Sequence, residues 1–338
     1  MWMRFAVYGR KKRLILALAA MLTCLALLFR VATVMADWRQ ATAAQPLKWV
    51  DFQVTAAAMA DALACDEASR ETEYPMDWID LLAYLGVRYG GDFSRYRKEH
   101  LNALAEKLRG GESMESLTAD MKYFDYYRTA YDAVLGGLAG EYFMKKPAPS
   151  ESVEVWERHY GLKGYAPIAE GWHFSHSDDF CAARDFGFKR RHLGHDLFGT
   201  VGTPVINVET CVVEALGWNR YGGWRVGMRS LDGRRYYYYA HLRSGHPYAE
   251  GLAEGQLVYA GDVIGYMGMT GYSEQEDFNG MQHPHLHFGI QLIFDENSKQ
   301  EIWIDTYELV KFLCRHRSSV QQEGSEYRRV YGFDEPME

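Results

Sequence analysis

The chain has 338 residues, of which 48% are apolar and 24% charged, so one or two globular domains fit within its length. Its net charge of −8 is unevenly spread, because residues 1–35 hold six basic and no acidic side chains and the remainder therefore carries −14. An acidic body argues against nucleic-acid binding, and a total of only 9 prolines argues against long disordered linkers.

Residues 1–36 are predicted to target the protein to a membrane. The basic cluster Arg10–Arg13 precedes Leu14–Phe29, sixteen residues without a charge, and this order predicts a cytoplasmic N-terminus and an exported body. The run is shorter than the roughly 20 residues of a spanning helix, and it reaches that length if Arg30 extends its charge to the outer interface. We favour an uncleaved single-pass anchor in the cell membrane. The alternative is a signal peptide cleaved near Ala36, with a secreted product.

Residues 37–147 are predicted to form a helical domain. Apolar side chains recur at helical spacing in Met76–Leu85 and Leu101–Leu108, and paired glycines end both segments. A long aromatic-rich helix is expected over Tyr123–Phe143. No catalytic cluster occurs in this region of the sequence, so we interpret it as a spacer or as a surface for an envelope protein partner. Lys145–Ser150 contains two prolines and is expected to be the linker that follows.

Residues 148–300 change to short apolar runs separated by glycine turns, which predicts a mainly antiparallel all-β domain, either a barrel or a sandwich. The predicted strands lie within Pro204–Val208, Cys211–Leu216, Trp224–Ser230, Arg234–Leu242, Val258–Met267 and Pro284–Phe294. Residues 301–338 are expected to add a helix over Trp303–Arg317 and a tail. The predicted fold class is therefore α+β overall.

The five cysteines contain no Cys-x-x-Cys pair, so a zinc–thiolate site is not expected. Cys24 lies in the apolar N-terminal run. The other four could form a disulfide, although buried free thiols are slightly favoured, and the sequence alone cannot pair Cys65, Cys181, Cys211 and Cys314.

The segment Gln282–Gly289 is the strongest indication of a functional site. Side chains alternate across a strand, so His285 and His287 share one face while Leu286 and Phe288 occupy the other. Two neighbouring imidazoles suit a metal ion. An isolated His-x-His is, however, more often a solvated polar face.

Two upstream segments offer further donors. His192 and Asp196 are four positions apart, in a stretch where Gly194 favours a loop or an extended turn. His241 is expected to end a strand, on the same face as Tyr237 and Tyr239. Each pattern alone is weak, because a histidine at a strand end is usually structural.

The joint occurrence carries more weight, because seven of the twelve histidines fall between His192 and His287. A catalytic zinc needs three protein ligands and an open position for water, together with acid/base groups beside that water. Three separate segments supply enough donors for both tasks, and the sequence therefore predicts a zinc hydrolase.

The span from Asp185 to Leu292 resembles the lysostaphin-type (LytM-like) zinc metallopeptidases of metallopeptidase family 23. The blocks occur in the order of the family and cover about a third of the chain. They are Phe186-Gly187, His192-x-Gly194-x-Asp196, Gly202-Thr203-Pro204-Val205, Gly222-Gly223, Tyr239-Ala240-His241-Leu242, the glycine-spaced run Gly255–Gly265, and His285-Leu286-His287-Phe288.

This resemblance implies a role for each residue. It makes His192, Asp196 and His287 the ligands of one Zn²⁺ per chain, and His241 and His285 the catalytic pair that does not bind the metal. It further implies an extracytoplasmic endopeptidase that cuts stem or cross-link peptides of peptidoglycan. The alternative is a catalytically idle LytM-like scaffold in a cell-envelope or sporulation complex. The complete set of five residues favours the enzyme.

The sequence departs from the family pattern around these residues. Gly271–Met281 is longer and more acidic than the turn usual in the family, which leaves the choice of substrate open. His195, His246 and His283 are extra histidines, which we place at the surface or behind the ligands. Lys189–Arg191 forms a basic rim that either holds a substrate carboxylate or is simply a solvated charge run.

Overall fold

The computed structural model describes residue 47 and residues 50–338, apart from 146–154, 186–188, 296–299 and 337–338. The predicted targeting segment and most of the predicted linker lie outside the described residues. No helix in the described part of the chain combines the length and the apolar character needed to cross a membrane. Residues 48–338 form one compact unit.

The helical region begins as the sequence predicts. Its elements are α2 (Ala56–Ser69), α3 (Trp78–Tyr89), the 3-10 turn η1 (Phe93–Arg95), α4 (Lys98–Arg109), α5 (Met114–Thr118) and α6 (Phe124–Leu135). The carboxylate of Asp77 accepts hydrogen bonds from the first amides of α3, and Gly90 ends that helix in the left-handed conformation with φ of 64°. Ser113 caps α5 in the same way as Asp77 caps α3.

The predicted helix over Tyr123–Phe143 is wrong beyond Leu135. The chain turns at Gly136 and Gly137 and continues as strand β1 (Ala139–Lys145). A side chain at Gly137 would collide with the carboxylate of Glu209, so the chain passes close to a buried acidic group and leaves the helix. Strand pairing with distant residues, which a helical pattern does not reveal, then determines the conformation.

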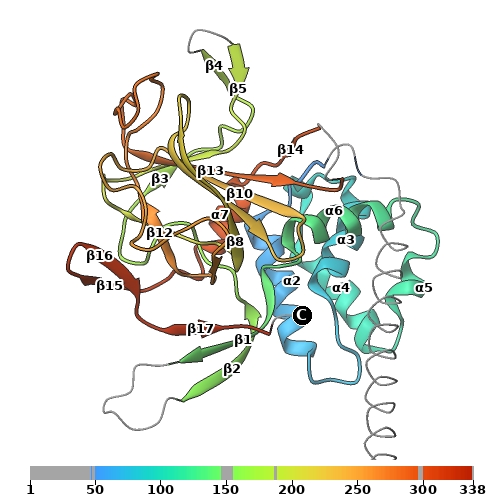
Figure 1. Cartoon of the computed structure of the whole chain (residues 1–338). Coiled ribbons are helices and arrows are strands. Elements are labelled where there is room, and N and C mark those ends of the chain that lie inside the picture. The colour runs from blue at the N-terminus through green and yellow to red at the C-terminus, as the bar shows by residue number, and fades with distance from the viewer. Residues whose placement is uncertain (1–46, 48–49, 146–154, 186–188, 296–299, 337–338) are drawn as a thin grey trace, which may run out of the picture. The chain divides into compact units, whose positions relative to one another are not determined.

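Strand β1 is the middle strand of a three-stranded sheet, between β2 (Trp156–Leu162) and β17 (Gly332–Asp334). The C-terminal region predicted as helix and tail therefore contains strands as well. Its helix, α7 (Tyr307–Leu313), is shorter than predicted, and a hairpin of β15 (Val320–Glu323) and β16 (Glu326–Arg329) follows it (Figure 1).

The main sheet has eight strands, and all of its pairings are antiparallel, as predicted for this region. In spatial order these are β11 (Leu257–Val258), β8 (Cys211–Asn219), β9 (Gly223–Ser230), β10 (Arg235–Ala240), β13 (His285–Leu292), β6 (His195–Phe198) and β3 (Ser175–His176), with β14 (Ile302–Trp303) also paired to β13. Besides the β15–β16 hairpin, two short pairs lie outside it: β7 (Pro204–Ile206) with β12 (Val263–Tyr266), and β4 (Ala183–Asp185) with β5 (Lys189–Arg191).

The core lies on one face of this sheet. Leu286, Phe288 and Ile290 of β13 are fully buried, as are Tyr237 and Tyr239 of the neighbouring strand β10. The alternation predicted for the His-x-His strand is thus confirmed on its apolar side.

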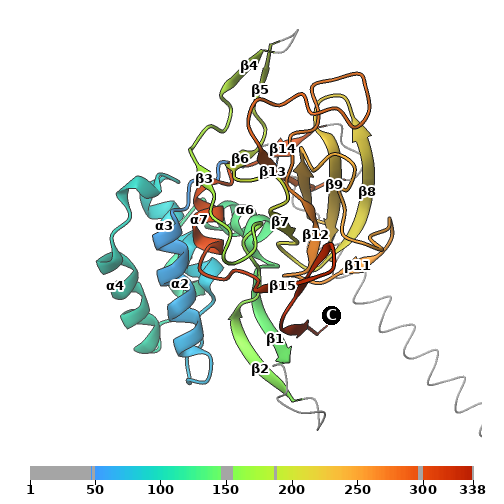
Figure 2. The ribbon, with the colours of Figure 1, turned by 90° about the vertical axis from the view of Figure 1, so that its left-hand side faces the viewer.

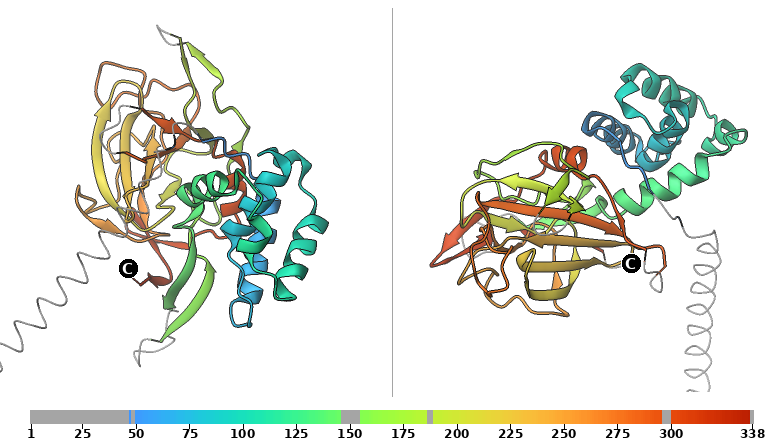
Figure 3. Two further views of the ribbon diagram at one scale, coloured as in Figure 1. Left: turned by 90° about the vertical axis from the view of Figure 1, so that its right-hand side faces the viewer. Right: turned by 90° about the horizontal axis from the view of Figure 1, so that it is seen from above.

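Helix α7 connects the strands to the helical region. In Figure 2 it lies between helices α2–α4 and the strands β8, β9 and β11, and Figure 3 shows the helices gathered beside the strands from two more directions. The ring of Phe312 in α7 stacks on Trp78 of α3, with 5.9 Å between the centroids. Glu308 accepts a hydrogen bond of 2.7 Å from the amide of Ala56, at the start of α2.

The four described cysteines are free thiols. Only Cys211 is buried, Cys181 is exposed, and Cys65 and Cys314 are intermediate. The preference for free thiols over a disulfide therefore agrees with the structure, but the expectation that they are buried holds for Cys211 alone.

Candidate metal centre

Strand β13 brings the predicted donors together because it pairs with β6 on one side and β10 on the other; Figure 2 labels β6 beside β13, and Figure 1 labels β10 beside β13. In this register His287 lies directly opposite Asp196 of β6 and also opposite Ala240, the last residue of β10. His192 precedes β6, and its backbone forms hydrogen bonds with Cys181 and Ala182. Residues almost 100 positions apart in sequence therefore meet at one place.

Three donor atoms form a nearly equilateral triangle. The Nε2 atom of His192 is 2.9 Å from Nδ1 of His287 and 3.0 Å from Oδ1 of Asp196. The third side, between Nδ1 of His287 and Oδ1 of Asp196, is also 3.0 Å. Ligands about 2.0–2.1 Å from a tetrahedral zinc ion lie about 3.3 Å from one another. The triangle is close to that size, and it is the one group of three such donors found among the described residues.

The surroundings determine where the protons lie on His192. Its Nδ1 is 3.2 Å from Oδ2 and 3.3 Å from the carbonyl oxygen of Asp179. Both are acceptors, so Nδ1–H donates to Asp179, and Nε2 is the nitrogen that faces the triangle. Arg184 contacts the carboxylates of Asp179 and Asp196 from the same side.

The carboxylate of Asp196 is held in its charged form. Burial by itself raises the pKa of this group, but hydrogen bonds from His192 and His287 outweigh that effect and hold the pKa well below its ordinary value. An anionic oxygen therefore remains at the triangle, where it suits a divalent cation.

Two further histidines flank the triangle without belonging to it. His285 donates its Nδ1–H to the carbonyl oxygen of His283 at 2.8 Å, and its Nε2 lies 3.8 Å from Oδ1 of Asp196. His241 donates its Nδ1–H to the carbonyl oxygen of Thr270, also at 2.8 Å. Each ring therefore keeps a lone pair on Nε2. Burial, and then the neighbouring histidines His285 and His287, lower the pKa of His241 well below its ordinary value.

The predicted common face of Tyr237, Tyr239 and His241 is wrong. Both tyrosines point into the core, whereas Tyr238 and His241 line the site. His241 follows the last residue of β10 and has a φ of +61°, so the alternation of the strand does not extend to it. The turn re-aims the imidazole towards His285, with 4.7 Å between the ring centroids.

Gly194 allows His287 to reach the triangle. A Cβ atom at this position would lie 2.5 Å from both Cε1 and Nε2 of the His287 ring. The glycine in His192-x-Gly194-x-Asp196 is therefore needed for close approach of the imidazole to the backbone.

The lengthened loop predicted to border the site does so, but its acidic groups face elsewhere. Tyr272 and Met281 line the site pocket, which has a volume of about 160 Å³. Asp277 accepts hydrogen bonds from the Trp224 indole at 2.7 Å and from the Gly245 amide at 2.9 Å. Glu274 pairs with Arg220 at 2.8 Å in an exposed position. Asp277 and Glu274 thus hold the loop to neighbouring segments, and Tyr272 lies at the site.

The extra histidines lie outside the triangle, as expected. His195 is buried, and its Nε2 lies 2.6 Å from Nδ1 of His176. His246 lies beside Glu326, and His283 offers its backbone to His285. The sequence analysis missed Asp179 and Arg184, which lie upstream of every family block.

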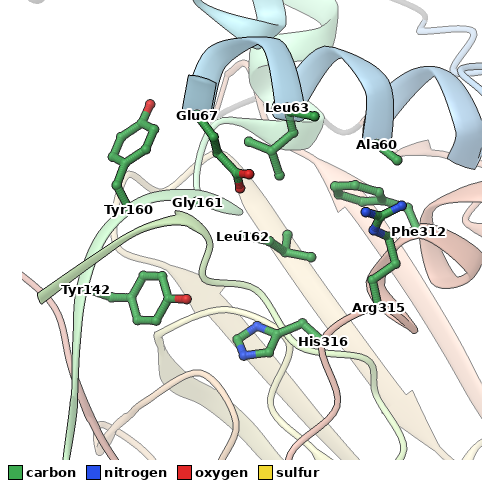
Figure 4. A pocket seen from close by; sticks show the side chains of 11 residues that line it. Ala60, Leu63, Glu67, Tyr142, Tyr160, Gly161, Leu162, Phe312, Arg315 and His316 are labelled. Carbon is green, nitrogen blue, oxygen red and sulfur yellow. The ribbon is translucent and has the colours of Figure 1, made fainter. Parts of the chain in front are cut away.

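A larger pocket, of about 250 Å³, lies where α2 approaches the β1–β2 hairpin and the end of α7. In Figure 4, Glu67 and Arg315 project into it around Leu162, beside the rings of Tyr142 and Phe312. It contains no group of three metal donors among the described residues. Size alone therefore does not identify the reactive site, and the smaller pocket around the histidines is the chemical candidate.

Comparison with known proteins supports this assignment. Residues 190–300 match the family model described as Peptidase family M23. The L-Ala–D-Glu endopeptidase of Bacillus subtilis (strain 168) is 40% identical over 184 residues, which make up 54% of this chain and 51% of that protein. Lysostaphin of Staphylococcus staphylolyticus is 36% identical over 98 residues, 29% of this chain and 18% of that protein. The chain thus spans about half the length of the Bacillus relative.

The fold is also shared with a solved structure. The crystal structure of a lytM protein from Ruminococcus gnavus ATCC 29149 covers 81% of this chain and 92% of its own, with a TM-score of 0.51 and 24% identity. The shared fold is mainly antiparallel β with helices, and its extent shows that the likeness continues beyond residues 190–300. The matched region contains all three donors and both flanking histidines, so the similarity to peptidase family M23 covers the whole candidate site.

Proposed function

We propose that the chain is a zinc metalloendopeptidase that hydrolyses peptide bonds of peptidoglycan, with one zinc ion per chain. The observation that carries this proposal is the donor triangle of His192, Asp196 and His287, flanked by two imidazoles whose free Nε2 atoms are on the side of the site pocket. The relatives are named for endopeptidase activity, which supports the same reaction class.

Within this class we propose the L-Ala–D-Glu bond as the bond that is cut. The supporting observation is the extent of similarity. The relative named for this bond is 40% identical over 184 residues, whereas the Staphylococcus capitis relative named glycyl-glycine endopeptidase ALE-1 is 37% identical over 98 residues.

The residues of the site divide the chemistry among them. Zinc held by the triangle supplies Lewis-acid chemistry, which activates water and polarises a carbonyl group. His285 accepts the proton of the attacking water at Nε2, because its Nδ1–H is already donated to the backbone. The same imidazole then delivers that proton to the leaving amine. His241 lies beside His285 and also keeps a lone pair on Nε2, so it offers a second acceptor for a proton of that water.

The proposed setting is outside the cytoplasmic membrane, with residues 1–36 as the anchor. The basic cluster before an apolar run in the sequence supports this orientation, and peptidoglycan lies within reach of a tethered enzyme. Protease treatment of intact cell-wall-stripped cells provides the test. A membrane-bound body that external protease degrades supports the proposal, and a protected body contradicts the orientation.

Mass spectrometry of muropeptides digested with the zinc-loaded protein tests the function itself. We expect products with a new D-Glu amine terminus. Products with new glycine termini would support endopeptidase activity but contradict the L-Ala–D-Glu bond as the bond that is cut. A zinc-loaded protein that releases no peptide products would instead favour the idle scaffold.

A further inference from the structure

The site pocket contains one arginine side chain, that of Arg190, whose hydrogen-bond donors are only partly used. Among the described residues that line this pocket, the basic side chains are those of Arg184 and Arg190. Arg184 is engaged by the carboxylates of Asp179 and Asp196. Arg190 forms no ion pair with any described carboxylate, and its Nε is buried without a hydrogen-bond partner. A buried donor left without a partner destabilises the fold, so the presence of this one at the pocket calls for an explanation.

Two tyrosines hold the guanidinium of Arg190 in place. Its Cζ atom lies 5.1 Å from the ring centroid of Tyr272 and 5.6 Å from that of Tyr221. Its Nη2 atom also donates to the hydroxyl of Tyr272. Both tyrosines line the same pocket as the donor triangle. These contacts hold the guanidinium group at the pocket, and its Nε–H remains without a partner.

The strand separates this arginine from its basic neighbours. Alternation along β5 places Arg190 on the opposite face from Arg191, which is exposed to solvent. The basic rim seen in the sequence therefore has two parts. Arg191 belongs to a solvated charge run, whereas Arg190 is half-buried in the pocket.

A carboxylate is the ligand that matches this arrangement. A guanidinium edge presents two parallel N–H donors, which pair with the two oxygens of a carboxylate. This step rests on the function proposed above. A glutamyl residue within a peptide has two carboxyl groups and uses only one of them to continue the chain, so it retains one carboxylate. A glycyl residue retains none.

We propose that Arg190 forms a carboxylate-binding subsite next to the metal triangle, which holds the free carboxylate of the glutamyl residue at the scissile bond. The lengthened loop then has a role in substrate choice, because it supplies Tyr272 as one wall of the subsite. In this view the enzyme selects acidic stem peptides over neutral glycine bridges through one residue of the β4–β5 hairpin.

The experiment compares two synthetic peptides that contain the L-Ala–D-Glu bond and differ only in the free carboxyl group, which is either a carboxylate or a primary amide. The wild-type zinc protein should cleave the carboxylate peptide with a kcat/KM about 10- to 100-fold higher, the range expected for hydrogen bonds to a charged group. Arg190→Gln should bring this ratio close to one, mainly through a loss on the carboxylate peptide. Arg191→Gln is the matched control and should keep the wild-type ratio.

Arg190→Lys separates charge from geometry, because it keeps the positive charge and loses the paired donors. It should give an intermediate ratio, and it serves as the second variant if Arg190→Gln does not fold. Zinc content of each variant shows whether the metal site is intact. If Arg190→Gln slows both peptides by the same factor, or keeps the wild-type ratio, Arg190 does not bind the carboxylate and the proposal is overturned.

Failure of the proposed function leads to a different result. In that case the wild-type protein hydrolyses neither peptide, and calorimetric binding of the two intact peptides to wild type and Arg190→Gln decides about the subsite. A preference for the carboxylate peptide that disappears in Arg190→Gln supports the subsite. Equal affinities of wild type for the two peptides overturn it.

Discussion

The two ends of strand β10 carry buried polar clusters of opposite design. Where the strand begins, Arg235 donates to Glu209 through Nε at 2.7 Å and through Nη2 at 2.9 Å, and Nη1 donates to the carbonyl oxygen of Ala133 in α6 at 2.9 Å. Tyr237 donates to the same carboxylate. Where the strand ends, His241 stands beside His285 and the donor triangle, whose lone pairs converge on one point.

The difference lies in whether the cluster is complete. At the first end every charged group is matched by another within the protein, so the cluster fastens helix α6 to the sheet. At the second end two imidazole nitrogens and one carboxylate oxygen lie about 3 Å apart, and positive charge, either protons on the imidazoles or a metal ion, is needed to hold them together. A satisfied cluster therefore indicates a structural role here, and an unsatisfied one indicates chemistry.

The largest effect is expected for His287→Ala, which removes one of the three donors of the triangle. Zinc content should fall from about one per chain towards zero and peptide hydrolysis should disappear. A catalytic zinc needs three protein ligands, and this variant keeps only two of them. Metal analysis of the purified protein, together with circular dichroism to show that the sheet persists, provides the measurement. A variant that keeps both zinc and activity would remove His287 from the ligand set.

His285→Ala changes the same strand face two residues earlier and should separate binding from catalysis. We expect zinc content close to that of wild type and a kcat lower by about 10²- to 10⁴-fold, because a proton acceptor is lost while the triangle remains. Muropeptide release measured beside metal content checks both parts. Normal hydrolysis would exclude the acid/base role, and loss of zinc would make His285 a ligand instead.

At the other end of β10, Arg235→Met should act on stability. It leaves Glu209 buried without its cation, which typically costs about 3–5 kcal/mol. Denaturant unfolding at a fixed zinc concentration gives the free energy of unfolding, since bound metal also contributes to it. Arg234→Met is the matched control: its ion pair with Asp132 is 34% exposed on each side, so a loss below about 1 kcal/mol is expected. Equal losses in the two variants would contradict the structural role of the buried pair.

The polar clusters at the two ends of β10 also differ in whether they can be predicted from the sequence. Four of the candidate site residues follow from short motifs, since the His-x-His pair needs only strand alternation and His192-x-x-x-Asp196 matches a family block, whereas the orientation of His241 does not follow from its strand. The Arg235–Glu209 pair does not follow from any motif. Its partners are 26 residues apart, and only the sheet brings them together with α6.

The same limit explains the errors in the fold. The helix expected through Phe143 ends at Leu135 because β1 pairs with β2 and with β17, and β17 lies almost 200 residues further along the chain. Hydrophobic periodicity reports only local preference, and distant strand pairing overrides it here. Asp179 was missed for a related reason, because its function depends on a contact with His192 and not on any pattern around it.

The smallest expected effect concerns that missed residue, which completes one part of the otherwise unsatisfied cluster. Asp179→Ala removes the acceptor that fixes the proton on Nδ1 of His192, while all three ligands remain. Loss of such a supporting partner typically weakens metal affinity by about 10- to 100-fold, which competition with a chromophoric zinc chelator measures. Asp178→Ala is the matched control, because Asp178 is exposed and forms its hydrogen bond with Asp305. If both variants bind zinc like wild type, the backbone carbonyl of residue 179 alone orients His192, and the carboxylate has no part in holding the metal.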